Sequence, residues 1–105
     1  MPTPHRPPIA VLKGLQVLGT DIRDARKRRK LPMSVVAERA FTSRPTLQRI
    51  EEGDPGVGIG IYASVLQSLG LLQNLTDVAS IGNDPVGQSL ASADLPRRIH
   101  VKKRS

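Results

Sequence analysis

The sequence predicts a small all-α domain of five helices, and three observations lead to this prediction. Apolar residues recur at steps of three and four from residue 9 to residue 81, which is the period of one helical face. Glycine and proline stand between these periodic stretches, where the chain is expected to turn. With one Phe, one Tyr and no Trp, the core must be built from Leu, Ile, Val and Ala, which suits a helical bundle.

The first eight residues predict a disordered arm because they hold four prolines, and the first helix begins after them at Ile9. One face of this helix is apolar and is formed by Leu12, Leu15, Leu18, Gly19, Ile22 and Ala25. The helix ends in the basic run 26–30, whose cations suit a helix C-terminus, and Pro32 prevents its continuation.

Two short helices joined by a tight turn are predicted next, over residues 33–40 and 44–52. Ser43 suits the N-cap of the second helix, Pro45 is tolerated in its first turn, and Gly53 is a natural stop. Five inward positions carry apolar residues, namely Val36, Ala37, Ala40, Leu47 and Ile50. This pattern predicts a helix-turn-helix, with the small Ala37 where its two helices cross most closely.

Two further helices complete the predicted domain, which spans residues 9–82. The fourth covers residues 59–69 and ends at Gly70, with an apolar side formed by Ile59, Tyr62, Ala63, Leu66 and Leu69. The fifth is short and lies around residues 75–81, with an apolar side that packs back on the domain and is formed by Leu75, Val78 and Ala79.

Residues 83–105 are predicted to form a basic C-terminal tail, because the helical periodicity is lost beyond Gly82. Asp84 and Pro85 suit the start of one more helical turn. The tail ends in a basic patch formed by Arg97, Arg98, Lys102, Lys103 and Arg104. The weak alternation over residues 98–102 leaves two alternatives open, an edge strand formed on dimerisation and a solvated tail.

Several classes of function are disfavoured by what the sequence contains. There is no cysteine, and the two histidines lie in the predicted arm and tail, so we expect no catalytic site, no metal site and no cofactor. No apolar run approaches the roughly 18 residues of a membrane span, and the N-terminus has no hydrophobic signal region. We therefore expect a cytoplasmic protein that is not an enzyme and does not contact a membrane.

Charge and the outward side of the helix over residues 44–52 indicate double-stranded DNA as the partner. The formal net charge is +7 and the pI is about 10.9, in the range typical of nucleic-acid-binding domains. The residues expected to contact base edges in the major groove are Arg44, Thr46, Gln48 and Arg49. The residues expected to hold phosphates are Ser34, Ser43, Arg28, Arg29 and Lys30. RNA is an alternative, but this helix suits the wide major groove of B-form DNA better.

Residues 18–69 resemble the helix-turn-helix of the Cro/CI-repressor type, the XRE family. The overlapping stretch TLQRIEEGDPGVGIGIYASVLQSLGL, residues 46–71, is similar to HipB-type antitoxins, and its most specific element is residues 49–53. The resemblance implies a transcriptional repressor that regulates its own operon, with a HipA-like kinase toxin as partner. It also implies a structural ion pair between Arg26 and Glu51. A stand-alone regulator without a toxin is the alternative.

A homodimer is expected because the predicted core is small and a single reading helix gives limited affinity. Such a dimer would read a palindromic operator whose half-sites lie one helical turn, or a multiple of it, apart.

Two positions depart from the pattern of the family that the chain resembles. Met33 stands where a phosphate-contacting Gln is usual, and Phe41 stands at the turn position usually given to Gly. A bulky residue in a left-handed conformation costs roughly 1 kcal/mol or more. We therefore expect either a different turn geometry or a Phe41 side chain anchored in the core.

Overall fold

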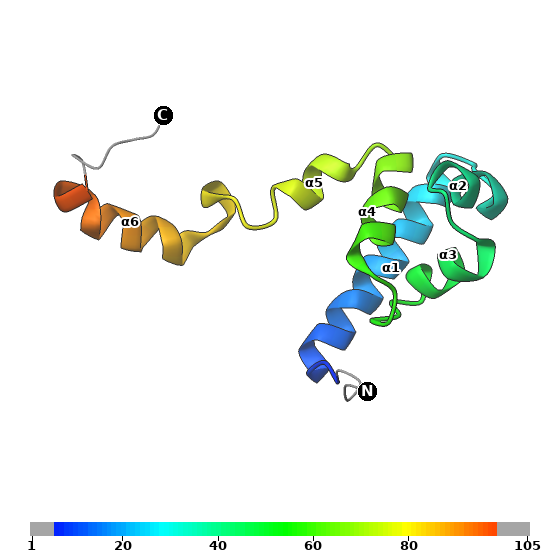
Figure 1. The fold of residues 1–105 in the computed structure, drawn as a ribbon, viewed down its shortest axis with the longest axis horizontal. Helices are drawn as coiled ribbons and strands as arrows, with labels where there is room; N and C mark the ends of the chain where they lie inside the picture. The colour runs from blue at the N-terminus through cyan, green and yellow to red at the C-terminus, as the bar shows by residue number, and fades with distance from the viewer. Residues whose placement is uncertain (1–5, 99–105) are drawn as a thin grey trace. The chain divides into compact units, whose positions relative to one another are not determined.

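The computed structural model describes the backbone of residues 6–98 and the side-chain surroundings of residues 6–93. Residues 6–98 form six α-helices and one short 3-10 helix, with no strand among them (Figure 1). The predicted all-α class is therefore confirmed, while the predicted count of five helices is wrong. The chain divides into two compact units, of which the first ends at Leu72 and the second begins at Gln73. The first unit thus ends ten residues before the predicted boundary at residue 82.

The first unit contains α1 (Ile9–Arg28), α2 (Met33–Arg39), α3 (Arg44–Glu51) and α4 (Ile59–Ser68). The helix ends lie within one or two residues of their predicted positions because the punctuating residues act locally. The Ser43 hydroxyl caps α3 by accepting from the backbone N–H of Thr46 at 3.2 Å, and Pro45 occupies the first turn as predicted.

The core of the first unit lies between these four helices and is almost entirely aliphatic. Its largest fully buried side chains are Ile22, Val36, Leu47, Ile50 and Val65. The five inward positions predicted for α2, α3 and the turn between them are all buried. Along α1 the buried residues begin at Gly19, whereas Leu12, Leu15 and Leu18 of the predicted apolar face are half-buried.

The inward side of α4 differs from the prediction at two positions. Ile59 is 72% exposed, whereas Val65, which was not assigned to the core, is fully buried. Ile59 is the first residue of α4, where the side chain is open to solvent. Val65 shares a face with Tyr62 and Leu69, which are three and four residues away, so both are its neighbours on the helix surface.

All four helices of this unit end in the same way, with a residue in the left-handed region that closes the last turn through two backbone hydrogen bonds. These residues are Lys30 (φ 55°), Phe41 (φ 56°), Gly53 (φ 80°) and Gly70 (φ 77°). Glycine adopts this conformation without a steric penalty, whereas a residue with a Cβ adopts it only at a steric cost. Two of the four helix ends are therefore strained.

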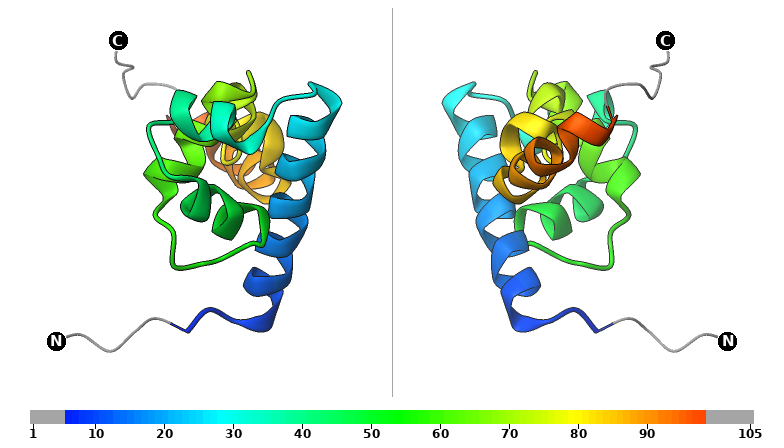
Figure 2. Two further views of the ribbon diagram at one scale, coloured as in Figure 1. Left: turned by 90° about the vertical axis from the view of Figure 1, so that its right-hand side faces the viewer. Right: turned by 90° about the vertical axis from the view of Figure 1, so that its left-hand side faces the viewer.

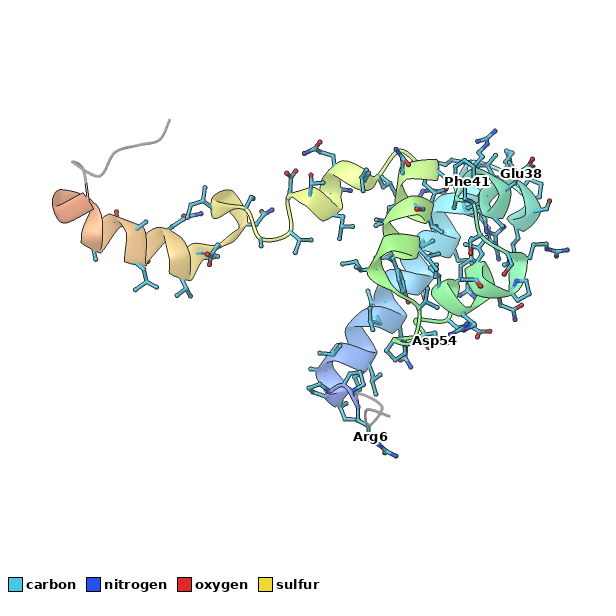
Figure 3. The ribbon with its side chains drawn as sticks, viewed as in Figure 1. Arg6, Glu38, Phe41 and Asp54 are labelled. Carbon is cyan, nitrogen blue, oxygen red and sulfur yellow. The ribbon has the colours of Figure 1, made fainter. Side chains whose placement is uncertain are left out.

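Phe41 is the more unusual of the two strained residues. Its N–H donates to the carbonyl of Glu38 at 3.1 Å, and the N–H of Thr42 donates to that of Ala37 at 2.9 Å. The turn thus keeps the geometry of a glycine-terminated helix, and the alternative of a different turn is wrong. The alternative of a core anchor is also wrong, because Phe41 is 96% exposed (Figure 3).

Replacing Phe41 with glycine is expected to raise the free energy of unfolding by about 1 kcal/mol, because the left-handed strain is removed. No packing is lost, since the side chain is exposed. Urea denaturation followed by circular dichroism measures the effect. Phe41→Ala is the control, because it removes the ring but keeps the Cβ, and it is expected to give no comparable gain. Equal stability of the glycine and alanine variants would contradict the assignment of strain.

The second unit differs most from the sequence prediction. The boundary between the units falls within α5 (Leu72–Thr76), whose first residue belongs to the first unit and whose other residues belong to the second. The 3-10 helix η1 (Ile81–Asn83) and α6 (Pro85–Arg98) follow α5. The predicted fifth helix at residues 75–81 is wrong in position, because α5 begins directly after the turn at Gly70 and ends five residues earlier than predicted. Val78 and Ala79 are exposed instead of packing back.

The predicted tail is helical over most of its length, since α6 covers 14 residues. Asp84 starts this helix, because its Oδ1 accepts from the N–H of Gly87 at 2.9 Å and its carbonyl accepts from the N–H of Gln88 at 2.8 Å. Arg97 and Arg98 form the end of α6. The rest of the predicted edge strand, with Lys102, Lys103 and Arg104, lies outside the described residues, as does most of the predicted N-terminal arm.

Among the described residues, no helix combines the length and the apolar character needed to cross a bilayer. The same part of the chain holds no cluster of three or more His, Asp or Glu side chains arranged to bind a metal ion.

Candidate nucleic-acid interface

The C-terminal end of α3 lies directly against the backbone of α1. A Cβ built on Gly19 would meet the carbonyl oxygen of Ile50 at 2.5 Å and that of Glu51 at 2.7 Å. A Cβ on Gly53 would likewise meet the Cα of Gln16 at 2.7 Å. Two glycines thus allow the helices to approach more closely than any larger residue permits, and Figure 2 shows α3 beside the middle of α1.

A buried ion pair between side chains also holds α3 against α1. Arg26 Nε donates to Glu51 Oε2 at 2.7 Å, and Arg26 Nη2 donates to Glu51 Oε1 at 3.1 Å. The third nitrogen, Nη1, donates to the carbonyl of Leu31 at 3.1 Å. Both charged residues are buried, with 8% of Arg26 and 6% of Glu51 exposed. The ion pair implied by the family resemblance is therefore present, and it links α1, the α1–α2 turn and α3.

With its inner side held in this way, α3 presents polar side chains outward. Leu47 and Ile50 are fully buried on the inner side. Three of the four residues predicted to contact bases are exposed together on this helix, namely Arg44, Gln48 and Arg49. The fourth, Thr46, is half-buried, and its Oγ1 accepts from the hydroxyl of Ser43 at 2.9 Å.

Two of these outward side chains contact acidic residues that the sequence analysis did not assign to the site. Gln48 Nε2 donates to Glu52 Oε2 at 3.2 Å, and Arg49 Nε donates to Asp54 Oδ2 at 2.8 Å. The first contact has the i, i+4 spacing of helix neighbours and could have been predicted. The second spans five residues and depends on the left-handed Gly53, which turns the chain back.

The Asp54 carboxylate is held from two directions. Its Oδ2 accepts from Arg49, and its Oδ1 accepts from the backbone N–H of Gly56 at 2.7 Å. These two hydrogen bonds hold the pKa of Asp54 below its ordinary value, with the Arg49 bond as the larger cause. The carboxylate is therefore ionised at neutral pH.

The side chain of Tyr62, on α4, binds the backbone of the turn that carries Asp54. Its hydroxyl donates to the carbonyl of Asp54 at 2.9 Å. Burial raises the pKa of the Tyr62 phenol, and the negative charge of Asp54 raises it further. The phenol thus remains a neutral hydrogen-bond donor throughout the physiological range.

The residues predicted to hold phosphates lie around the α1–α2 turn and the start of α3. Arg28, Lys30 and Ser34 are exposed. Arg29 is also exposed, but its Nη1 donates to the carbonyl of Ala25 at 2.8 Å, so it caps its own helix. Ser43 is exposed while its hydroxyl is engaged with Thr46. Exposed cations that were not assigned to the site include Lys27 in the last turn of α1 and Arg39 at the end of α2.

The start of α2 departs from the family pattern as its sequence implied. Pro32 is its N-cap residue and forms no side-chain hydrogen bond, and Met33 is half-buried. The predicted basic patch at the C-terminus belongs to the second unit through Arg97 and Arg98, while its other members lie outside the described residues.

Charge is distributed unevenly along the chain. Residues 6–54 contain eleven Lys and Arg and six Asp and Glu, whereas residues 55–93 contain no Lys or Arg and two Asp. Within residues 6–93, the excess of positive charge therefore belongs to the segment that forms α1, α2 and α3, while residues 94–105 contain five Lys and Arg and one Asp. Comparisons with protein-family models, with curated proteins and with solved structures found no match.

Proposed function

We propose that this chain is a sequence-specific double-stranded DNA-binding protein, in which α2 and α3 form a helix-turn-helix and α3 enters the major groove. One observation carries the proposal. The inner side of α3 is held against α1 by Gly19 and by the Arg26–Glu51 pair, while its outer side exposes Arg44, Gln48 and Arg49.

The chemistry of the outer side suits base edges. An α-helix fits the major groove, where Arg can donate two hydrogen bonds to guanine and Gln can pair with the edge of adenine. The exposed cations at the end of α1 are suited to phosphates, which set the register of a protein on DNA without reading its sequence. Gln48 must exchange its contact with Glu52 for a contact with a base, so Glu52 competes with DNA for this side chain.

We propose a homodimer as the binding form. One helix of eight residues reaches only a few base pairs, and a two-fold dimer doubles the contacts over a palindromic site. Sedimentation of the purified chain with and without a palindromic duplex tests the number of copies bound.

The role proposed for the DNA-binding protein is that of a repressor of its own operon and an antitoxin. This part of the proposal rests on the resemblance of residues 46–71 to HipB-type antitoxins, and a stand-alone regulator is the alternative. Co-purification of a HipA-like kinase encoded beside the chain would favour the antitoxin. Failure of the two purified proteins to associate would favour the regulator.

Replacing Arg44 or Gln48 with alanine is expected to weaken binding to the preferred duplex by about 1–3 kcal/mol each, because each removes a base contact. The preferred duplex is first selected from a randomised pool with the wild-type chain, and affinities are then measured by fluorescence anisotropy. Arg28→Ala is the matched control, since loss of a phosphate contact weakens binding to all sequences equally and lowers the salt slope by about 0.9. Unchanged affinity in the Arg44 and Gln48 variants would contradict the assignment of α3 as the reading helix.

A further inference from the structure

Arg49 and Asp54 form an ion pair on the surface of the first unit, at the end opposite to Phe41 (Figure 3). Arg49 Nε lies 2.8 Å from Asp54 Oδ2, and the two side chains are 50% and 32% exposed. An ion pair that is this open to water contributes little to folding stability, because solvent screens it and two side chains lose their freedom. The main effect of this ion pair is therefore to set the position of the Arg49 guanidinium.

The carboxylate of Asp54 is rigid enough to impose a position. Its second oxygen is fixed by the N–H of Gly56, and the carbonyl of Asp54 is fixed by the hydroxyl of the buried Tyr62. The preceding residue, Gly53, packs on the backbone of α1. The turn that carries Asp54 is thus tied to α1 and to α4, and Arg49 is the flexible member of the pair.

Asp54 contacts only one edge of the Arg49 guanidinium, and this determines which N–H donors remain for another partner. Asp54 accepts from Nε, so the Nη1 and Nη2 groups keep N–H donors that lie in one plane. A planar fork of this kind matches the two acceptors of guanine, O6 and N7, in the major groove. Held by one edge, the fork also loses less rotational freedom when it binds.

We propose that Asp54 is a positioning residue for DNA recognition, which orients Arg49 toward a guanine edge in a double-stranded DNA site. This inference rests on the proposed function and adds a residue that does not itself contact a base. A carboxylate repels phosphate, so its simple electrostatic effect on DNA binding is unfavourable. Orientation of Arg49 has the opposite effect, but only on a sequence that places guanine under this side chain.

The two effects can be separated with two duplexes of equal length, one selected by the wild-type chain from a randomised pool and one of random sequence. Asp54→Asn keeps an oxygen for the N–H of Gly56 but removes the negative charge that holds Arg49. Asp24→Asn is the matched control, because Asp24 is an exposed acid on α1 and its loss changes the net charge equally. Arg49→Ala and the double variant Arg49→Ala/Asp54→Asn complete the set.

We expect Asp54→Asn to lower the ratio of affinities for the selected and the random duplex about 10-fold, through weaker binding to the selected duplex alone. Asp24→Asn leaves this ratio unchanged. In the Arg49→Ala background the Asp54 substitution has no further effect on the ratio, because Asp54 acts through Arg49.

Three results would overturn the inference. The ratio for Asp54→Asn could equal that for Asp24→Asn, which would leave only the electrostatic effect of Asp54. It could fall as far with Arg49 absent as with Arg49 present, which would show that Asp54 acts independently of it. If the wild-type chain selects no sequence, the proposed function fails and the role of Asp54 falls with it. The wild-type selection thus separates failure of the function from failure of this inference.

Discussion

Replacing Glu51 with alanine is expected to lower the free energy of unfolding by about 3–5 kcal/mol, because it leaves the guanidinium of Arg26 buried without its counter-charge. Arg26 is 8% exposed and cannot turn its charge to water without opening the contact between α1 and α3. The remaining hydrogen bond to the carbonyl of Leu31 satisfies only one of its three donor nitrogens. A loss of this size is a large part of the stability of a small domain.

Urea denaturation followed by circular dichroism measures this loss, and Glu52→Ala is the matched control. Glu52 is the next residue along the chain but is exposed, so its substitution is expected to stay within about 0.5 kcal/mol of wild type. The double variant Arg26→Met/Glu51→Leu removes both charges together and is expected to regain most of the loss. Similar stabilities for the Glu51 and Glu52 variants would contradict the structural role of the pair.

Replacing Gly19 with alanine is expected to destabilise the protein by about 1–3 kcal/mol, although alanine is the better helix former. The new methyl group would lie 2.5 Å from the carbonyl oxygen of Ile50 and 2.7 Å from that of Glu51. Both are backbone atoms, so they cannot move aside as the end of a side chain could. The helix α3 must shift away from α1, which also strains the buried ion pair.

Gly14→Ala is the matched control, because Gly14 lies in the same helix and a Cβ there meets nothing within 4 Å. This variant is expected to gain about 0.5–1 kcal/mol from helix propensity alone. Thermal and urea unfolding of the two variants should therefore move in opposite directions. A gain in stability for Gly19→Ala would show that α3 does not lie as close to α1 as the structure indicates.

The helices of the first unit could be predicted from the sequence because their boundaries depend on neighbours only a few residues away. Ser43, Pro45 and Gly53 each act within one helical turn, and the ends of α3 lie within one residue of the predicted ones. The register of α4 could not be predicted equally well. Its sequence is apolar on several sides, and packing against the other helices decided that Val65 is buried and Ile59 exposed.

The second unit was predicted poorly because few apolar side chains in it are buried. Val78, Val86 and Leu90 are exposed, so the periodicity that identifies a helical face is weak. Its helices are set by local hydrogen bonds instead. Asp84 starts α6, and Gln88 Nε2 donates to the carbonyl of Ile81 at 2.7 Å.

The exposed residues of the candidate site were identified from the sequence, but their contacts were only partly predictable. The contact of Gln48 with Glu52 follows from helix spacing. The contact of Arg49 with Asp54 required the turn at Gly53, and the exposure of Phe41 required the path of the chain between α2 and α3. Neither can be read from periodicity.

The sequence by itself determined the all-α class, the inward side of α2 and α3, and the residue types that α3 exposes, because these follow from helical period and from caps within a turn. Only the tertiary structure decided how closely α3 approaches α1, which side chains Arg49 and Gln48 contact, and that Phe41 is strained and exposed. The Arg26–Glu51 pair joins residues that are 25 positions apart. Interactions over such separations depend on the packing of whole helices, and that packing is set by the shapes of all the buried side chains together.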